Sequence, residues 1–335
     1  MIEGARRVLE SLRNAGEIPC SGEELSSQLG VSRAQVWKHV STLRKRGYAI
    51  DGAPGGGYSL IASPDRLYPE EISCGLETRW LGQEIQHLDE TDSTNRVAAE
   101  LARAGAPHGM AVIAEAQTAG RGRLGRSFFS PAYSNLYTSI VLRPDLDTAS
   151  APTLLLAAGV AVAETVIDVL GKAAELEIKW PNDVLLGGLK TSGILMELGA
   201  EENRVSYAIL GIGVNLNLER EHFPDEFRDR ATSLLSHSGN PVDRVEFTRR
   251  LFQNLENVLE EHAQGGLAQL RPRFDKHFHM LGRKVTVAQV GGERIEGIAA
   301  GIAANGALQI DQATKQRIEV LAGDVTICKD DSPKE

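Results

Sequence analysis

The chain has 335 residues, with 36 lysines and arginines against 45 aspartates and glutamates, so its formal net charge is -9 at pH 7. This acidic average excludes a uniformly basic surface for nucleic acid. The composition is 42% hydrophobic and 24% charged, which is typical of globular proteins and excludes a mainly disordered chain. Because this length exceeds what one hydrophobic core usually serves, we expect two or three domains.

The longest apolar stretch runs from Thr153 to Leu170 and is interrupted by Glu164 and Asp168. It is too short and too charged for a comfortable membrane span, so we expect a buried helix and no membrane partner. The first seven residues lack the apolar run and the small-residue cleavage site of a secretory signal. We therefore expect a cytoplasmic protein.

Cysteines and paired histidines offer little for a metal. Cys20, Cys74 and Cys328 lie far apart and form no C-x-x-C motif, which supports neither a disulfide framework nor a zinc site. We expect all three to be reduced thiols. His277 and His279 lie close together, but two histidines without a third ligand are more often surface or interface residues. We therefore predict no metal site made by a cluster of protein residues.

A short helix is predicted before Gly30. Residues 21–24 have the S-x-x-E form of a capping box, and Leu25 and Leu29 follow four apart on one helical face. Gly30 can then close the helix and begin a turn.

A second helix is predicted to begin after Ser32, a favoured N-cap residue with Gln35 three positions later. Apolar residues at helical spacing form its buried stripe: Val36, Val40 and Leu43. Its other face carries side chains that can donate to phosphates or to base edges: Arg33, Gln35, Lys38, His39, Ser41 and Thr42. For a lone helix an ordinary solvated face is the open alternative.

Two short strands, 47–50 and 58–60, flank a glycine-rich turn at 54–57, as in a β-hairpin. The order helix, turn, helix and hairpin predicts a winged helix-turn-helix DNA-binding domain over residues 1–63. This segment holds eight basic and six acidic side chains, a net charge of +2, so the remainder carries -11. We expect DNA contacts from five residues of the second helix and its cap: Ser32, Arg33, Gln35, Lys38 and His39.

A strand at 86–89, a polar turn and a capped helix are predicted next. The turn contains Asp92, Ser93, Thr94 and Asn95, and apolar residues at helical spacing follow it. Plain N-capping explains these polar side chains by itself, and their spacing alone favours that explanation. A binding role for them therefore needs support from elsewhere in the chain.

The stretch 117–126 is a glycine-rich loop that contains a formal G-x-G-x-x-G. A dinucleotide-binding fingerprint requires a helix after the glycines, whereas a strand-like run at 135–142 follows here, so we reject that interpretation. Arg121, Arg123 and Arg126 offer guanidinium groups to a phosphate or carboxylate. A solvated basic turn is the alternative, but three arginines in an acidic domain favour an anion-binding loop.

The segment 179–183, with the sequence K-W-P-N-D, joins two predicted strands through a kink. A glycine pair then makes a turn, and Lys190 opens the next strand. A further buried strand, 208–215, ends at Asn215 and contains glycines that permit close approach of a ligand. Taken singly, Lys190 would be a solvated hairpin residue and Asn215 a turn former.

Together, these motifs closely resemble those of biotin-protein ligases in order and spacing. The resemblance rests on five segments: 92–95, 117–126, 179–183, 190–197 and 211–215. Its most specific parts are the G-R-G-R-x-G-R loop and the K-W-P-N-D segment, and it covers nearly the whole chain. With a winged helix in front, the chain resembles the bifunctional type, which is both a biotin ligase and a biotin operon repressor.

The resemblance implies a two-step reaction. The biotin carboxylate attacks the α-phosphate of ATP to give biotinyl-5'-AMP and pyrophosphate, and a lysine of a biotin carboxyl carrier protein then attacks the mixed anhydride. The first step brings two anions together, so cations must screen their repulsion. The implied ligands are biotin, ATP and Mg²⁺, with biotinyl-5'-AMP as corepressor. The implied partners are the carrier protein, operator DNA and, when adenylate is bound, a second copy in a homodimer.

The resemblance also implies roles for individual residues. The biotin-binding residues would be Ser93, Thr94, Asn95, Gln117, Arg121, Gly122, Arg123 and Lys190. The ATP- or adenylate-binding residues would be Arg121, Arg123, Asn182, Lys190 and Asn215. The catalytic residues would be Lys190, Arg123 and Asp183, with Lys190 at the carboxylate or α-phosphate. Two other functions stay open: a lipoate or octanoate ligase of the same superfamily, and a ligand-sensing repressor without catalysis.

Short strand-like runs separated by glycine turns fill residues 284–329, which predicts a small β-barrel. The resemblance implies an SH3-like domain there. We therefore expect an α+β, multidomain chain: a winged helix-turn-helix at 1–63, a mixed α/β ligase domain with a largely antiparallel sheet at 64–280, and an SH3-like barrel at 281–335.

Overall fold

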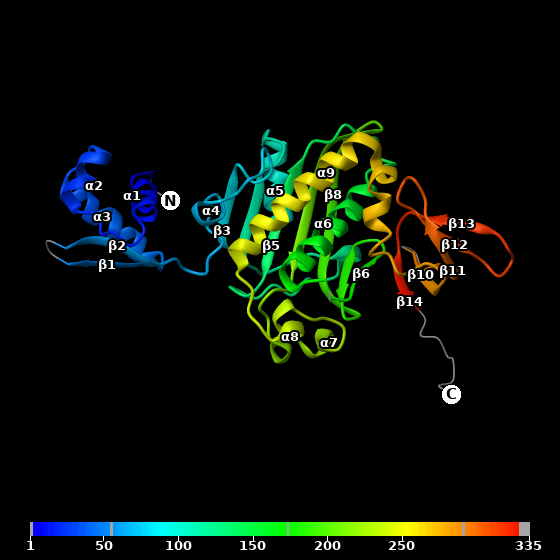
Figure 1. The fold of residues 1–335 in the computed structure, drawn as a ribbon. Coiled ribbons are helices and arrows are strands. Elements are labelled where there is room, and N and C mark those ends of the chain that lie inside the picture. The colour runs from blue at the N-terminus through cyan, green and yellow to red at the C-terminus, as the bar shows by residue number, and fades with distance from the viewer. Residues whose placement is uncertain (1–2, 54–55, 173, 290–291, 328–335) are drawn as a thin grey trace. The chain divides into compact units, whose positions relative to one another are not determined.

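The computed structural model describes residues 3–53, 56–172, 174–289 and 292–327 (Figure 1). It divides into two compact units, Met1–Arg66 and Leu67–Glu335. Part of the predicted hairpin turn and Cys328 lie outside the described residues. Cys20 is a buried free thiol and Cys74 an exposed one, as expected for those two residues.

The first unit consists of three helices and a hairpin: α1 (Glu3–Ala15), α2 (Gly22–Leu29), α3 (Arg33–Lys45), β1 (Ala49–Ala53) and β2 (Gly57–Ala62). Ser21 Oγ accepts the Glu24 backbone N–H, and Ser32 Oγ accepts that of Gln35, so both predicted N-caps are confirmed. Gly30 closes α2 in the left-handed conformation, which favours glycine. The sequence prediction missed α1, whose buried side packs into the same core.

His39 corrects the predicted exposed face of α3. Its side chain is buried, and a Cβ added to Gly4 of α1 would come within 2.4 Å of its Nε2. Gln35 Nε2 lies 3.3 Å from the same nitrogen. The placement of His39 on a DNA-facing surface is therefore wrong, because α1 covers this side of α3 and helical spacing alone does not reveal the cover.

The second unit is built on a seven-stranded sheet. In spatial order its strands are β3 (Ile85–Thr91), β4 (Ala111–Gln117), β5 (Leu136–Leu142), β9 (Arg204–Val214), β8 (Leu189–Glu201), β7 (Asp183–Leu186) and β6 (Leu176–Lys179). Only the β3–β4 pair among these described strands is parallel, so the predicted largely antiparallel sheet is confirmed.

Helices cover both faces of this sheet, because alternate side chains of its strands enter different cores. Ile113 and Ile140 join a large core with α6 (Thr153–Leu170) and α9 (Arg244–Phe274). Their neighbours Val112 and Val141 join a smaller core with α5 (Thr94–Arg103). Figure 1 shows α6 and α9 lying alongside each other.

The predicted buried helix is α6, which is long and apolar enough to cross a membrane but packs against α9 with 67% of it buried. The sequence prediction missed α9, a 31-residue helix interrupted by a kink at Gly265 and Gly266. Three short helices complete the unit: α4 (Pro69–Ile72), α7 (Asp225–Arg228) and α8 (Leu234–Ser238).

The C-terminal part is a five-stranded antiparallel sheet. Its strands are β10 (Lys284–Ala288), β11 (Arg294–Ile302), β12 (Leu308–Asp311), β13 (Arg317–Val320) and β14 (Asp324–Ile327), in the order β13-β12-β11-β10-β14. The described strands leave β13 and β14 as edges, so the observed arrangement is an antiparallel sheet without closure into a barrel. Trp180 Nε1 donates to Gly306 O at 2.9 Å and ties this sheet to the end of β6.

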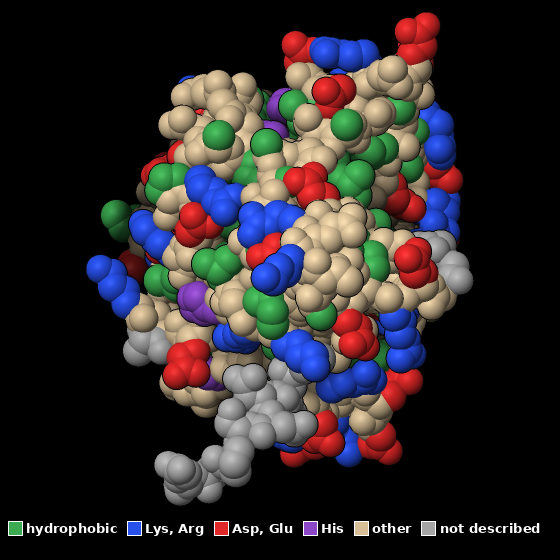
Figure 2. All heavy atoms as spheres, turned by 90° about the vertical axis from the view of Figure 1, so that its right-hand side faces the viewer, with side chains coloured by type: hydrophobic (Ala, Val, Ile, Leu, Met, Phe, Trp, Pro, Cys, Tyr) green, Lys and Arg blue, Asp and Glu red, His purple; other side chains and the backbone are tan. Residues whose placement is uncertain are grey.

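Acidic and basic side chains lie interspersed on the face of the molecule that includes these C-terminal strands (Figure 2). Two ion pairs involve this part of the chain: Arg317 of β13 pairs with Asp311 of β12, and Arg283, just before β10, pairs with Glu177 of β6. Such exposed pairs contribute little to stability individually. The mixed charge gives this face no single-sign field to attract an anionic polymer.

Candidate active site

A cavity of about 750 Å³ lies beside the first turn of α5, over the middle of the seven-stranded sheet. This volume falls within the usual range for small-molecule sites. The predicted residues that line it are Ser93, Thr94, Asn95, Gln117, Arg121, Gly122, Arg123, Arg126, Lys179, Asn182, Asp183 and Lys190. The structure thus brings together segments that are up to about 100 positions apart in the sequence.

One end of the cavity is a buried hydrogen-bonded network. Gln117 Oε1 accepts the Thr94 backbone N–H at 2.9 Å and the Thr94 hydroxyl at 3.1 Å. Ser139 Oγ lies 2.8 Å from Thr94 Oγ1 and 2.7 Å from Asn95 Oδ1. Ser93 stands at the N-cap position but makes no side-chain capping bond. Plain capping is therefore not what these side chains do, and the network presents fixed polar groups to a ligand.

Three glycines open the floor of the cavity: Gly193 on β8, and Gly211 and Gly213 on β9. A Cβ added to Gly211 would lie 2.0 Å from Asn95 Oδ1. A Cβ added to Gly213 would lie 2.6 Å from the Phe128 ring. Side chains at these positions would collide with the residues that shape the site, so glycine is required for space.

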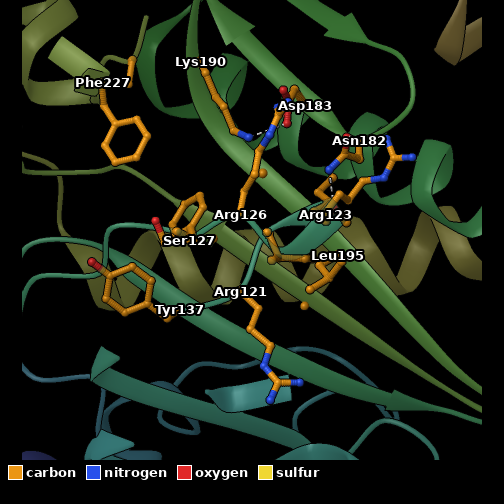
Figure 3. Close-up of a pocket in the computed structure, with 18 of the residues that line it drawn as sticks. Arg121, Arg123, Arg126, Ser127, Tyr137, Asn182, Asp183, Lys190, Leu195 and Phe227 are labelled. Carbon is orange, nitrogen blue, oxygen red and sulfur yellow. Dashed lines mark hydrogen bonds and ion pairs between the residues drawn. The ribbon is translucent and has the colours of Figure 1, made fainter. Parts of the chain in front are cut away.

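The other end of the cavity carries the charges (Figure 3). Lys190 Nζ lies 2.6 Å from Asp183 Oδ1. Asn182 Nδ2 donates to Ile194 O at 2.8 Å, which turns its Oδ1 toward Arg123. The antiparallel register of β7 with β8 places Asp183 opposite Gly193, so a ligand over the glycine floor would reach this charged group.

The three loop arginines have different surroundings. Arg123 Nη1 donates to Gly323 O at 3.2 Å, and burial lowers the pKa of this guanidinium while Asp324 and Asp183 oppose the shift. It stays cationic at neutral pH because arginine deprotonates only at very high pH. Arg126 pairs with Asp324 of the C-terminal sheet. Arg121, which lies 3.6 Å from Glu197, extends away from the charged end in Figure 3.

Of the predicted binding and catalytic residues of the ligase site, Asn215 alone does not line the cavity in the part of the chain that the structure describes. It is buried at the end of β9, where its Nδ2 donates to Thr232 O at 3.1 Å. The structure adds lining residues that the sequence did not reveal, among them Phe128, Tyr137 and Phe227. Phe227 stands on α7 apart from the arginines in Figure 3. Phe227 comes three residues after Pro224 in a polar segment, and this local sequence does not indicate a binding role.

Metal ligands are sparse in the described part of the chain. One group of three possible ligands lies close together there, Glu219, Glu221 and His222, and all three are exposed and outside the cavity. Exposed acidic groups of this kind are common without an ion. His277 is buried, which lowers the pKa of its imidazole, whereas His279 is exposed.

Comparison with protein-family models gives three matches along the chain. Residues 5–59 match the HTH domain, residues 88–215 match the Biotin/lipoate A/B protein ligase family, and residues 280–327 match the Biotin protein ligase C terminal domain. The second match contains the whole arginine loop and the network at the start of α5.

Full-length relatives decide the family. The "Bifunctional ligase/repressor BirA" of Bacillus spizizenii is 38% identical over 91% of this chain and 93% of its own length. The protein of the same name from Escherichia coli is 36% identical over 87% of this chain and 88% of its own length. The chain belongs to the bifunctional ligase/repressor family. Similarity at both ends means that this family member has the DNA-binding unit as well as the ligase unit.

Solved structures support the fold of the ligase unit. The biotin protein ligase from Aquifex aeolicus in complex with biotin and ATP has a TM-score of 0.62 and 28% identity. The match covers 74% of this ligase/repressor family member and 99% of that chain. A ligase of this fold therefore accommodates both small molecules named in that structure.

Proposed function

We propose that the chain is a biotin-protein ligase that also represses transcription. As a ligase it activates biotin with ATP and transfers it to a lysine of a biotin carboxyl carrier protein. The observation that carries the proposal is the cavity itself, which joins a buried neutral network at one end to Lys190, Asp183 and Arg123 at the other. A molecule with a neutral hydrogen-bonding head and an anionic tail is complementary to such a site.

The biotin head would lie at the neutral end. Its ring urea offers one acceptor and two donors, and Thr94, Asn95 and Gln117 supply partners of both kinds. Ser139 lies behind them and holds Thr94 and Asn95 in place. The aliphatic chain of biotin would follow the glycine floor, where no side chain blocks the way. The carboxylate would then reach Lys190 and Arg123.

Activation forms a bond between a biotin carboxylate oxygen and the α-phosphorus of ATP and breaks the bond from that phosphorus to pyrophosphate. Lys190 would contact the carboxylate or α-phosphate, and Arg123 would screen the repulsion of the two anions as the loop closes over them. Fixed cations in a partly buried site act more strongly than they would in water. Gly122 would allow the loop backbone to approach the adenylate, and Arg121 would join the loop from its outer side.

Transfer to the carrier forms an amide between its lysine and biotin and releases AMP. Asp183 lies beside Lys190 and would orient the incoming amine or hold the lysine in place. Asn182 and Phe227 would bind the nucleotide, Phe227 by stacking against the base. Mg²⁺ would arrive with ATP and neutralise phosphate charge. Because the Asp183 carboxylate is already paired with Lys190, phosphate oxygens of ATP would supply most of the ligands of Mg²⁺.

The DNA-binding unit gives the second activity. Biotinyl-5'-AMP would act as corepressor by ordering loops that favour a homodimer, which binds an operator with two half-sites. Arg33 and Lys38 remain exposed on α3 and would contact this DNA. The exposed cap residue Ser32 and the partly exposed Gln35 would add contacts beside them. We place this activity in the cytoplasm and infer that the C-terminal sheet belongs to an SH3-like domain.

Incubation with biotin, ATP, Mg²⁺ and a biotin carboxyl carrier domain tests the ligase. We expect release of pyrophosphate and a mass increase on one carrier lysine. Replacing biotin by lipoate or octanoate distinguishes the related ligases, and modification with those acids instead would overturn the choice of substrate. No modification with any of the three acids would contradict the ligase proposal.

A loop variant separates the ligase from a sensor without catalysis. We expect Arg123→Gly to release free biotinyl-5'-AMP, because a guanidinium that helps to retain the adenylate is lost. Arg317→Ala removes an exposed arginine of the C-terminal sheet and serves as the control. Unchanged turnover and unchanged adenylate retention in Arg123→Gly would argue against the role proposed for Arg123, whereas ligand binding by the parent without any turnover would favour the sensor. Operator binding measured with and without biotinyl-5'-AMP tests the repressor.

A further inference from the structure

Trp37 is a prominent side chain of the DNA-binding unit that the proposed function leaves without a role. It lies in the middle of α3, and 57% of its surface is exposed. Tryptophan is usually well buried, because it gains more than other residues from leaving water. The other large apolar side chains exposed in the described part of this unit, Ile18 and Ile61, lie outside α3.

The outer face of α3 places Trp37 among cations. Its exposed residues are Arg33, Ala34, Trp37, Lys38, Arg44 and Lys45. Positions 34, 37, 38 and 45 follow helical spacing and form one stripe, opposite the buried stripe that enters the core. The stripe therefore has Ala34 and Trp37 as its apolar part and Lys38 and Lys45 as its cations, and Arg33 lies just before it at the start of the helix.

Two residues expected on this face are engaged elsewhere. His39 is buried, and Gln35 is turned toward it. Arg44 donates through Nη2 to Ile50 O at 2.8 Å and is held against β1. Trp37 is therefore the large apolar side chain of α3 that remains exposed and can enter a groove.

We propose that Trp37 reads the C5-methyl group of a thymine in the major groove of the operator. A thymine methyl is the apolar group that a major groove presents, and apolar side chains recognise it by contact. Arg33, Lys38 and Lys45 would meet the phosphates on either side, which position a helix without reading sequence. The inference rests on the DNA-binding half of the proposed function and adds a specificity-determining residue to it.

The charges around Trp37 favour DNA over a second copy of the chain. In a two-fold symmetric contact the same patch meets itself, so the cations around one tryptophan would face those around the other. Like charges brought together in this way oppose association. In DNA the thymine methyl groups lie in the major groove between two rows of phosphates. The methyl groups are complementary to Trp37, and the phosphates are complementary to the cations beside it.

The test begins with the full chain, biotin and ATP, used to select duplexes from a pool with a randomised core. In the selected site each thymine is then replaced by deoxyuridine, which removes only the methyl group. For the unmodified protein we expect at least one position per half-site where this change lowers affinity about fourfold, the contribution of one buried methyl. For Trp37→Ala the same change should have no effect, and affinity for the selected site should fall on the order of tenfold or more.

Two further variants identify the type of contact. Trp37→Phe keeps an apolar face and should keep the sensitivity to deoxyuridine. Lys38→Ala should weaken selected and random duplexes alike and reduce the salt dependence of binding. Because Trp37 is exposed, its variants should melt close to the parent temperature, which circular dichroism checks.

The outcomes separate the two proposals. If the selected site contains no thymine, or if deoxyuridine affects the parent and Trp37→Ala equally, the inference about Trp37 is wrong while DNA binding stands. If the parent binds no duplex under any of these conditions, the repressor proposal fails and the inference fails with it. If Trp37→Ala changes only the sedimentation of the free protein, the residue contacts protein and the inference is overturned.

Discussion

Lys190 Nζ lies 2.6 Å from Asp183 Oδ1 at the charged end of the cavity, on strands joined by a two-glycine turn. The ammonium is therefore held in place before any substrate arrives. Such preorganised charge stabilises a transition state without the cost of reorienting solvent.

We expect Lys190→Ala to lower the rate of biotin-dependent pyrophosphate release by about 100-fold to 1,000-fold, the usual effect of removing one fixed charge from such a site. Lys190→Arg should recover part of the rate, because the charge remains while the geometry changes. Lys179→Ala removes a second lysine of the cavity lining and serves as the matched control. Equal losses in Lys190→Ala and Lys179→Ala would refute a specific role for Lys190.

The contact between Gly211 and Asn95 leads to a prediction about substrate binding. A Cβ at position 211 would lie 2.0 Å from Asn95 Oδ1, so Gly211→Ala should displace this amide from Ser139 and from the cavity. We expect the KM for biotin to rise at least about tenfold, because the ligand loses a positioned hydrogen-bond partner. Steady-state kinetics and isothermal titration with biotin measure the effect.

Gly22→Ala is the control for this glycine. A Cβ there would meet nothing closer than 3.6 Å, and the residue opens a helix in the DNA-binding unit. Its biotin KM should equal that of the parent. A Gly211→Ala protein with unchanged biotin affinity would show that Asn95 does not contact the ligand.

Local patterns predicted much of the fold, because caps, turns and strand alternation are written in neighbouring residues. Both N-caps of α2 and α3, the apolar helix α6 and the strand pair around residues 179–183 follow from such patterns. The helices α1 and α9 have ordinary amphipathic spacing and were missed. The buried side of α3 could be predicted, but the cover that α1 gives to His39 could not.

The parts of the site that escaped prediction depend on contacts between distant positions. Ser139 gains its role only because the fold brings it to Thr94 and Asn95. Arg123 reaches the backbone of Gly323, 200 positions away. No local spacing encodes such a contact, so the sequence indicated the arginine loop but not the partner that holds it.

The indole of Trp180 provides a prediction about stability. Its Nε1 donates to Gly306 O at 2.9 Å within a fully buried contact between the ligase sheet and the C-terminal sheet. Trp180→Phe leaves this carbonyl without the donor and leaves unfilled volume, so we expect the free energy of unfolding to fall by about 2–4 kcal/mol. Chemical denaturation followed by circular dichroism measures the change.

Trp80→Phe is the matched control, because the Trp80 indole also donates a hydrogen bond, to Glu260 Oε1 at 3.0 Å, but it is only partly buried. Water can replace this donor, so the cost should be no more than about 1 kcal/mol. Equal destabilisation by the two substitutions would contradict the role assigned to Trp180.

The pH dependence of stability should depend on His262. Burial lowers the pKa of this imidazole below its ordinary value, and its Nε2 lies 2.8 Å from Thr153 Oγ1 in the core between α9 and α6. Below about pH 6.5 the unfolded chain therefore binds a proton that the folded chain resists, so stability falls as the pH drops through this range. Above that pH His262 is neutral in both the folded and the unfolded chain, so it no longer lowers the free energy of unfolding.

We expect the thermal midpoint of the ligase unit to fall between pH 7.5 and 5.5, and to fall less in His262→Gln, which cannot take up a proton. Part of the dependence should remain, because burial also lowers the pKa of His108 and His277. The comparison uses the difference between the two pH values for each protein, so a general loss of stability in the variant cancels. Identical differences in the parent and in His262→Gln would show that another group controls the acid sensitivity.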